Sequence, residues 1–202
     1  MIDQIENRLA HIHWSTCLYN TSLTELKIIS DETYTGEEIK IVNSHTFNFY
    51  RGTLQYCFIM EYCKLLESGS TKKEQNISSL NKLNEIFLEK TTKDFHNRHY
   101  ENIKLLEKIR GSNFYKKMKT LRDKKFSHAD NDEINEPFKF KAFITVDFEN
   151  AFEHLRIIKI IFNNFGSVFG RIYDLEIPSR DDRTRNFIKF QSEYQTYFNN
   201  NN

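Results

Sequence analysis

The chain has 202 residues, of which 39% are hydrophobic and 28% are charged, and its formal net charge is +1. This length suits a single globular domain, and the composition excludes a chain that is disordered throughout. Only two prolines and six glycines are present. Because sandwiches and barrels need many tight turns, this scarcity predicts an all-α helical bundle, with about five to seven helices.

The sequence shows no segment for secretion or membrane insertion. The first ten residues, MIDQIENRLA, carry charges and lack the apolar run of a signal peptide. The longest uncharged apolar stretch, Ile160–Gly170, is too short to span a bilayer, which takes ~20 residues. Cys17, Cys57 and Cys63 are odd in number and have no CxxC spacing, so neither disulfides nor a thiolate zinc site is indicated. We therefore expect a cytoplasmic protein that has reduced thiols and no membrane contact.

Apolar residues recur at steps of three and four, the period of an α-helix. An N-terminal helix is predicted from its stripe of Ile2, Ile5, Leu9 and Ile12. A second, longer helix is predicted over residues 41–66, where the core-facing positions are Phe47, Tyr50, Leu54, Phe58, Tyr62 and Leu65. The polar segment 67–76 is expected to be a loop.

Further helices are predicted over residues 79–90 and 94–110, and a fifth follows Ser112. Gly111 gives a stop signal, and Ser112 is the expected N-cap of the fifth helix. Residues 131–141 include Pro137 and no apolar stripe, so they are expected to form a loop. Asp147 is the expected N-cap of a last long helix, which reaches about residue 165.

The chain is expected to divide at residue 178. Residues 1–178 would form one helical domain, and residues 179–202 a C-terminal extension. The aromatic residues of the extension predict a short docking helix, followed by a frayed tail. These residues are Phe187, Phe190, Tyr194 and Phe198.

The segment Arg122–Asp130, RDKKFSHAD, carries the residues best suited to chemistry. Arg122 stays protonated at any working pH and offers a fork of donors to phosphate oxygens, whereas His128 titrates near neutrality. Together these side chains suit acid–base chemistry on a phosphodiester. RNA supplies its own nucleophile, the ribose 2′-hydroxyl, so this chemistry requires neither a metal nor another cofactor.

Positive charge is concentrated around this segment. Residues 104–125 contain nine basic and two acidic side chains, a local net charge of +7, so the rest of the chain sums to −6. Such a basic strip is typical of a surface that binds a nucleic-acid backbone, but also of an ordinary solvated helix face. The lysines predicted to contact RNA are Lys116, Lys117, Lys119, Lys124 and Lys125.

The spacing constrains how Arg122 and His128 can cooperate. In one straight helix, a separation of six residues places the side chains about 120° apart around the axis and ~9 Å apart along it. They converge on one phosphate if the helix ends or bends near Ser127, or if a second copy brings its own pair alongside across a two-fold axis. Asp123 would orient Arg122, and Asp130 would accept a hydrogen bond from the His128 ring and fix its tautomer.

The string RDKKFSHAD resembles the signature of the HEPN superfamily, in which an arginine followed by a polar residue lies a few residues before a histidine. More narrowly, it resembles the branch named after the abortive-infection U2 protein of bacterial phage defence. The resemblance implies a HEPN-like fold that dimerises through the motif helices, and a metal-independent endoribonuclease that acts as a toxin or antiviral defence effector. It assigns Arg122 and His128 to the catalytic pair and Asp123 to the polar position. The implied partners are RNA, a second copy, and an antitoxin or defence-system protein.

A second function class stays open, a non-catalytic helical module that binds nucleic acid or a partner protein, because a fold alone does not establish activity. The surroundings of Arg122 and His128 discriminate between the two classes. A nuclease needs both side chains at a cleft, whereas an intramolecular ion pair of either residue favours the module. The nearby His96 and His99 are expected to make surface or interhelical hydrogen bonds rather than to bind a metal.

Overall fold

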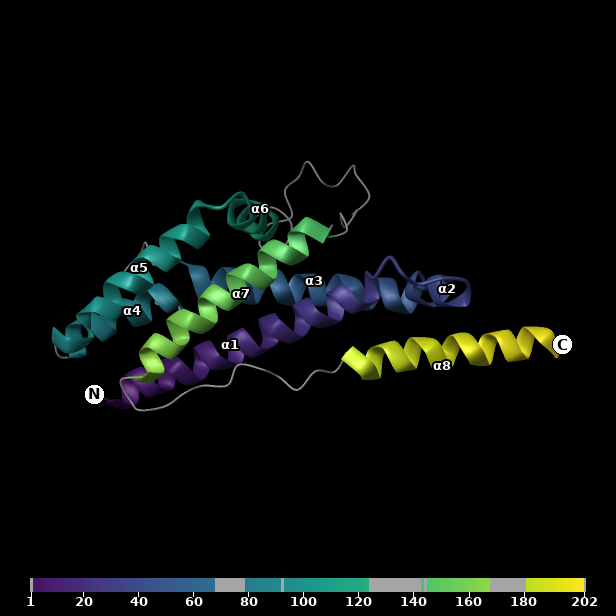
Figure 1. Ribbon diagram of the computed structural model, residues 1–202, viewed down its shortest axis with the longest axis horizontal. Coiled ribbons are helices and arrows are strands. Elements are labelled where there is room, and N and C mark those ends of the chain that lie inside the picture. The colour runs from purple at the N-terminus through teal and green to yellow at the C-terminus, as the bar shows by residue number, and fades with distance from the viewer. Residues whose placement is uncertain are drawn as a thin grey trace.

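The computed structural model describes residues 2–67, 79–91, 93–123, 143, 145–167 and 181–201. Every regular element in these ranges is helical, which confirms the predicted all-α class. They contain eight α-helices and one short 3-10 helix, so the predicted range of five to seven helices was slightly too low. Figure 1 shows an elongated arrangement of long helices. Within the described ranges, none of them has both the length and the apolar composition needed to cross a bilayer.

The centre of the bundle is the pair formed by α1 (Ile2–Ile29) and α3 (His45–Leu66). Their apolar faces are buried against each other, as the three-and-four spacing predicts. The buried residues include Leu9, Ile12 and Tyr19 from α1 and Phe58, Tyr62 and Leu65 from α3. Phe58 and Tyr62 thus pack the core, whereas Phe49, Tyr50 and Tyr56 of α3 are exposed, so the prediction that Tyr50 faces the core was wrong.

The helix predicted over residues 41–66 is in fact two helices. The short α2 (Glu37–Val42) ends at Asn43, and α3 begins after Ser44. The Ser44 hydroxyl accepts a hydrogen bond from the Phe47 backbone N–H, which is the usual role of a serine N-cap. Because the apolar spacing continues through this break, the sequence pattern does not reveal it. The break adds one helix to the predicted number.

The next helices begin close to the predicted positions. α4 (Leu80–Lys90) starts after its cap Ser79. A 3-10 turn, η1 (Lys93–Phe95), leads into α5 (His96–Gly111), and α6 (Asn113–Leu121) follows.

His99 joins α5 to α4. Its Nδ1 lies 3.0 Å from the backbone oxygen of Asn84, and both residues are buried. This contact confirms an interhelical hydrogen bond for His99.

α7 (Thr145–Gly166) packs on α1, α5 and α6. Its inward face buries Leu155, Ile158 and Phe162. Asp147, however, is not the N-cap of this helix, because it lies inside the first turn. Its carboxylate accepts hydrogen bonds from Lys117 of α6. An acidic residue in the first turn of a helix is favoured by the helix dipole. Asp147 also joins α7 to α6.

α8 (Asp181–Asn200) is a 20-residue helix and extends further than the short docking helix predicted. It packs on α1 and α2 and buries Ile188 among Tyr34, Ile41 and Val42. The aromatic residues predicted to dock are more than half exposed instead. The predicted domain boundary at residue 178 lies outside the described residues.

Candidate functional site

The described part of the candidate site is the end of α6. Phe114 and Met118 are buried and anchor the inner face of this nine-residue helix in the core. The α-helical geometry ends at Leu121, and Arg122 and Asp123 follow in a wider, π-type turn. A short and firmly packed helix therefore brings Arg122 to a fixed place at the edge of the bundle.

The Arg122 guanidinium is held by two carboxylates. Its Nε and Nη2 each lie 2.8 Å from Asp123 Oδ1, and its Nη1 lies 3.5 Å from Glu67 Oε1. The Arg122 side chain is only 20% exposed. Burial by itself lowers the pKa of Arg122, but the Asp123 hydrogen bond and the nearby negative charges raise it above its ordinary value. Arg122 is therefore a permanent cation with an oriented donor fork.

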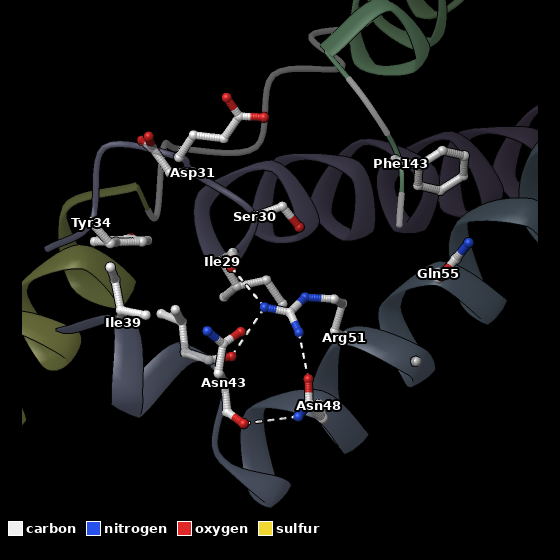
Figure 2. A pocket seen from close by; sticks show the side chains of 13 residues that line it. Ile29, Ser30, Asp31, Tyr34, Ile39, Asn43, Asn48, Arg51, Gln55 and Phe143 are labelled. Carbon is white, nitrogen blue, oxygen red and sulfur yellow. Dashed lines mark hydrogen bonds between the residues drawn. The ribbon is translucent and has the colours of Figure 1, made fainter. Parts of the chain in front are cut away.

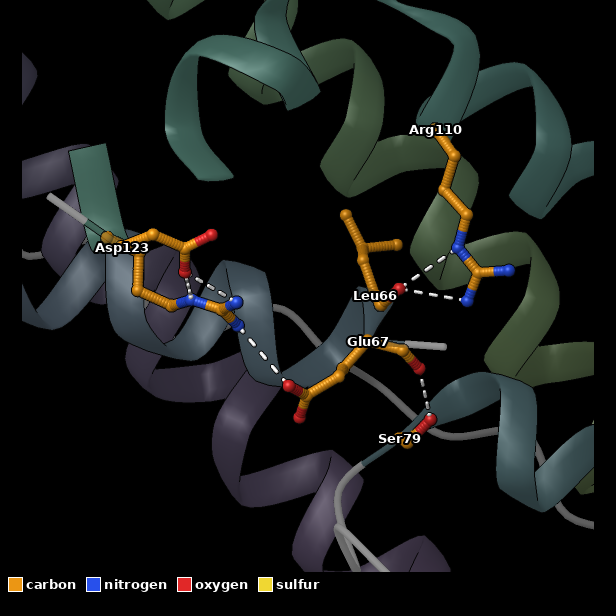
Figure 3. Close-up of polar contacts among 6 residues, drawn as sticks. Leu66, Glu67, Ser79, Arg110 and Asp123 are labelled. Atoms are coloured by element: carbon orange, nitrogen blue, oxygen red, sulfur yellow. Dashed lines mark hydrogen bonds and ion pairs between the residues drawn. The ribbon is translucent and has the colours of Figure 1, made fainter. Parts of the chain in front are cut away.

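Glu67 is the residue of this site that the sequence did not indicate. It follows the last residue of α3, and its own carbonyl accepts a hydrogen bond of 2.7 Å from the Ser79 hydroxyl. The preceding carbonyl, that of Leu66, accepts two hydrogen bonds from Arg110, at 3.0 and 2.8 Å (Figure 3). The backbone that carries Glu67 is thus tied down on both sides. Only the packing of α3 against α6 brings Glu67 to Arg122, so no local sequence pattern could reveal it.

Lys117, predicted to bind RNA, has an intramolecular partner. Its Nζ lies 2.7 Å from both carboxylate oxygens of Asp147, whose side chain is 6% exposed. A buried carboxylate needs such a cation, since an uncompensated charge in the interior is costly. The charge of Lys117 is therefore already balanced within the fold.

The other members of the basic strip also differ in whether they have an intramolecular partner. Lys108 pairs with Glu153 at 3.6 Å, and Arg110 holds the end of α3. Lys116 and Lys119 are exposed, and neither forms an ion pair with another described residue. The positive charge that α5 and α6 offer to a ligand is consequently smaller than the count from the sequence suggests.

The other predicted site residues lie outside the described residues. They are Lys124, Lys125, Ser127, His128 and Asp130. The structure thus brings Arg122 together with Asp123, as their adjacency requires, and adds Glu67. The convergence of Arg122 and His128 stays a prediction.

The charge of Arg122 affects the pKa of Cys63 of α3. Burial raises the pKa of the Cys63 thiol to about 12, and the positive charge of Arg122 offsets only part of this effect. Cys63 is therefore a thiol rather than a thiolate at neutral pH and is inert as a nucleophile. Among the described residues, no group of three or more histidine, cysteine, aspartate or glutamate side chains is placed to hold a metal ion.

A second arginine, Arg51 of α3, lines a cavity of about 660 Å³ beside the ends of α1 and α2 (Figure 2). Its Nη2 lies 3.0 Å from the carbonyl oxygens of both Ile29 and Val42, and its Nη1 donates to Asn48 Oδ1 at 2.6 Å. Ile29 and Val42 are the last residues of α1 and α2, so Arg51 caps two helix C-termini at once. These contacts make Arg51 a structural residue rather than a second candidate for phosphate binding.

The arrangement around Arg122 has a definite chemical capacity. A guanidinium with a fixed fork binds phosphate oxygens through paired, charge-assisted hydrogen bonds. Glu67 makes the longer of the two carboxylate contacts, so it is the group that an incoming phosphate would displace. Lys116 and Lys119 lie on the same short helix and supply further positive charge.

Comparison of the chain with protein-family models, with curated proteins and with solved structures found no match.

Proposed function

We propose that the protein is a metal-independent endoribonuclease of the HEPN type, acting as a toxin or abortive-infection effector. The observation that carries this proposal is the position of Arg122, a permanent cation with an oriented fork at the end of α6. The exposed lysines Lys116 and Lys119 support it, because binding of an RNA backbone is dominated by neutralisation of its phosphates. The resemblance of RDKKFSHAD to the HEPN signature supplies the reaction class.

In the proposed reaction, the ribose 2′-hydroxyl attacks the adjacent phosphorus and the 5′-oxygen of the next nucleotide leaves. His128 takes the proton of the 2′-hydroxyl or gives one to the leaving oxygen, and Arg122 stabilises the negative charge that develops on the phosphorane. Asp123 keeps Arg122 oriented, and Asp130 orients the His128 ring. The products carry a 2′,3′-cyclic phosphate and a 5′-hydroxyl.

Arg122 and His128 have to reach the same phosphate. The end of α-helical geometry at Leu121 supports the route in which the chain bends between them. If the chain bends there, Arg122 and His128 are not held ~9 Å apart along one straight helix axis. A two-fold pair of motif segments, which the HEPN resemblance implies, is compatible with this route and would double the positive charge at the cleft.

The proposal is tested by two substitutions and one control. Arg122→Ala and His128→Ala should each lower the rate of cleavage of single-stranded RNA by about 10²–10⁴ and leave the helical circular dichroism unchanged. Arg156→Ala is the matched control, because Arg156 is an exposed arginine of α7 that pairs with Glu153. Its cleavage rate should equal that of the unmodified protein.

The identity of the substrate and products adds a second test. Cleavage should persist in EDTA, and DNA or 2′-O-methyl RNA should resist, because neither offers a 2′-hydroxyl nucleophile. Cleavage that requires a metal contradicts the mechanism. A folded protein that cuts no RNA, in solution or in cells, contradicts the nuclease proposal as a whole.

One observation favours a second candidate, a non-catalytic module that binds nucleic acid or a protein. Arg122 is largely buried in an ion pair with Asp123 and Glu67, as a purely structural arginine would be. For such a module, Arg122→Ala should lower the melting temperature, and no variant should affect cleavage because none occurs. A loss of cleavage without a loss of stability rejects this candidate.

A further inference from the structure

α8 exposes a row of aromatic side chains along its length. We call Phe187, Phe190, Tyr194 and Tyr197 the aromatic stripe. Each of these side chains is between 52% and 68% exposed. The opposite side of the same helix carries Ile188, which is fully buried against Tyr34 and the α2 residues Ile41 and Val42. α8 is thus held to the body by one face and presents a second apolar face to its surroundings.

The spacing of the aromatic stripe is that of a helix-pairing seam. Its members follow one another at steps of three, four and three residues, which places them within about 80° of arc around the helix. This is the a/d spacing by which two helices pack side by side. Isolated exposed apolar residues are common on proteins, but a contiguous row on one helix marks an interaction surface.

An apolar groove adjoins the aromatic stripe. It has a volume of about 300 Å³ and lies between the start of α3 and the start of α8, lined by Thr46, Phe47, Tyr50, Arg183, Thr184 and Phe187. The Phe47 and Phe187 rings, whose centroids lie 6.4 Å apart, contact each other and both line the groove. One molecule therefore carries both projecting rings, at Phe190 and Tyr194, and a groove of the size of a ring beside them.

We infer that the aromatic stripe binds the aromatic stripe and groove of a second copy of this chain, in an isologous two-fold contact. Projecting rings and an adjoining groove on one surface are self-complementary, which is the property that such a contact requires. Aromatic side chains bury about 150–250 Å² each, so these four, already partly covered, would contribute roughly 1,000 Å² to the pair. That area meets the size at which specific interfaces begin, before the groove walls are counted.

The charges of α8 fit a second copy better than a charged partner. The helix has three acidic residues, Asp181, Asp182 and Glu193, and three basic ones, Arg183, Arg185 and Lys189. Its net charge is therefore zero, and it lacks the cationic face by which amphipathic helices bind anionic lipid or nucleic acid. A neutral helix also meets its own copy without net repulsion.

This contact is independent of the proposed nuclease site. α8 packs on α1 and α2, whereas α6 packs on α3, α5 and α7, and Figure 1 draws α6 and α8 on opposite sides of α1. An α8 contact and the chemistry of Arg122 can therefore fail separately. Mass measures the contact, and RNA cleavage measures the chemistry.

The first test is the molar mass in solution, measured by light scattering and sedimentation. The full chain should have about twice the mass of one 24.3 kDa copy. The double variant Phe190→Glu/Tyr194→Glu should have the mass of one copy, because it places charges in the seam. Thr196→Glu is the control, since it adds a negative charge to the opposite side of α8 and should leave the dimer intact. A monomeric full chain, or a double variant that still dimerises, overturns the inference.

The second test needs no destabilised variant. A photoreactive benzoylphenylalanine in place of Tyr194 should cross-link two copies on illumination. The linked peptides should come from α8 or from residues 46–50 of the other copy. A cross-link between copies that maps to α6, or no cross-link between copies at protein concentrations where the full chain is dimeric, overturns the inference even if every substitution variant misfolds.

Discussion

At the end of α6, two carboxylates compete with any incoming phosphate for one guanidinium. Asp123 makes two contacts of 2.8 Å with Arg122 and is its neighbour in the chain, whereas Glu67 makes a single contact of 3.5 Å. Both carboxylates are almost half exposed, and exposed ion pairs contribute only about 0–1 kcal/mol. Glu67 is therefore easily displaced, and its main effect on the proposed RNA ligand would be the repulsion of a nearby negative charge.

We predict that Glu67→Gln tightens RNA binding. The change removes a negative charge beside the fork of Arg122 and keeps the size of the side chain, so the dissociation constant should fall by roughly two- to fivefold at low salt. Fluorescence anisotropy with a labelled single-stranded RNA measures this. Glu85→Gln, a similar change on the exposed side of α4, should leave affinity unchanged. Equal affinity for both variants and the unmodified protein would show that Arg122 is not part of the RNA-binding surface.

Lys117 and Lys116 are adjacent lysines with different roles. Lys117 compensates the buried Asp147, whereas Lys116 forms no ion pair with another described residue. We predict that Lys117→Met lowers the free energy of unfolding by about 2 kcal/mol, because it leaves a buried carboxylate without this cation. Lys116→Met should change it by less than about 0.5 kcal/mol. Urea denaturation compares the two variants, and equal costs would show that the Lys117–Asp147 pair adds nothing to stability.

Among the elements, the helix starts show what the sequence predicts and what it conceals. Ser112 is recognisable as a cap because it follows Gly111 and precedes a new apolar pattern, and it accepts the expected hydrogen bond. Ser79, predicted only as the first residue of its helix, also accepts a capping hydrogen bond. Ser44 makes the same kind of contact, yet the apolar spacing continues on both sides of it. Local signals thus locate a helix start when the pattern around it changes, and they fail when it does not.

The candidate site shows the same limit. Arg122 and Asp123 were found from a nine-residue string, and they lie together because they are neighbours. Glu67 and the partner of Lys117 were not found, because these contacts join residues 55 and 30 positions apart. Contacts across such distances depend on how helices pack, and helix periodicity gives the faces that pack but not the pairs of side chains that meet.

We predict that the N-cap residue Ser112 stabilises α6, the helix that positions Arg122. Ser112 accepts a hydrogen bond of 3.0 Å from the Tyr115 backbone N–H. Ser112→Ala should therefore lower the free energy of unfolding by about 1 kcal/mol, and Ser112→Gly by only a few tenths. Ser112→Asp should retain the stability, since aspartate is also an effective cap. Chemical denaturation ranks the three variants, and an Asp variant as unstable as the Ala variant would rule out the capping role.

At the scale of the whole molecule, the core is organised around a buried polar pair. The Tyr62 hydroxyl lies 2.7 Å from His154 Nδ1, and the rings of Tyr19, Phe58 and Phe114 surround Tyr62. The pair connects α3 to α7 at the centre of the bundle. In the neutral tautomer that carries its proton on Nε2, His154 Nδ1 accepts a hydrogen bond from the Tyr62 hydroxyl, whereas a charged imidazolium has no free lone pair with which to accept it.

This pair makes the stability of the fold depend on pH. Burial lowers the pKa of His154 to about 4 from its ordinary value of 6.5, while the neighbouring Glu153 and Lys108 act in opposite directions. Between these two values the unfolded chain binds a proton that the native protein does not, so stability falls as pH falls. From about pH 7.5 to about pH 5 the loss from His154 alone should be about 2 kcal/mol.

His154→Gln isolates this contribution, because a glutamine can accept the Tyr62 hydrogen bond but does not titrate. Urea denaturation at a series of pH values should show that the unmodified protein loses about 2 kcal/mol more than His154→Gln between about pH 7.5 and about pH 5, since the other titrating groups are common to both. Above about pH 8 the two curves should run parallel, because His154 is then almost entirely neutral in both the folded and unfolded states. Parallel curves over the whole range would mean that His154 titrates in the folded protein as it does in the unfolded chain, which is incompatible with its burial against Tyr62.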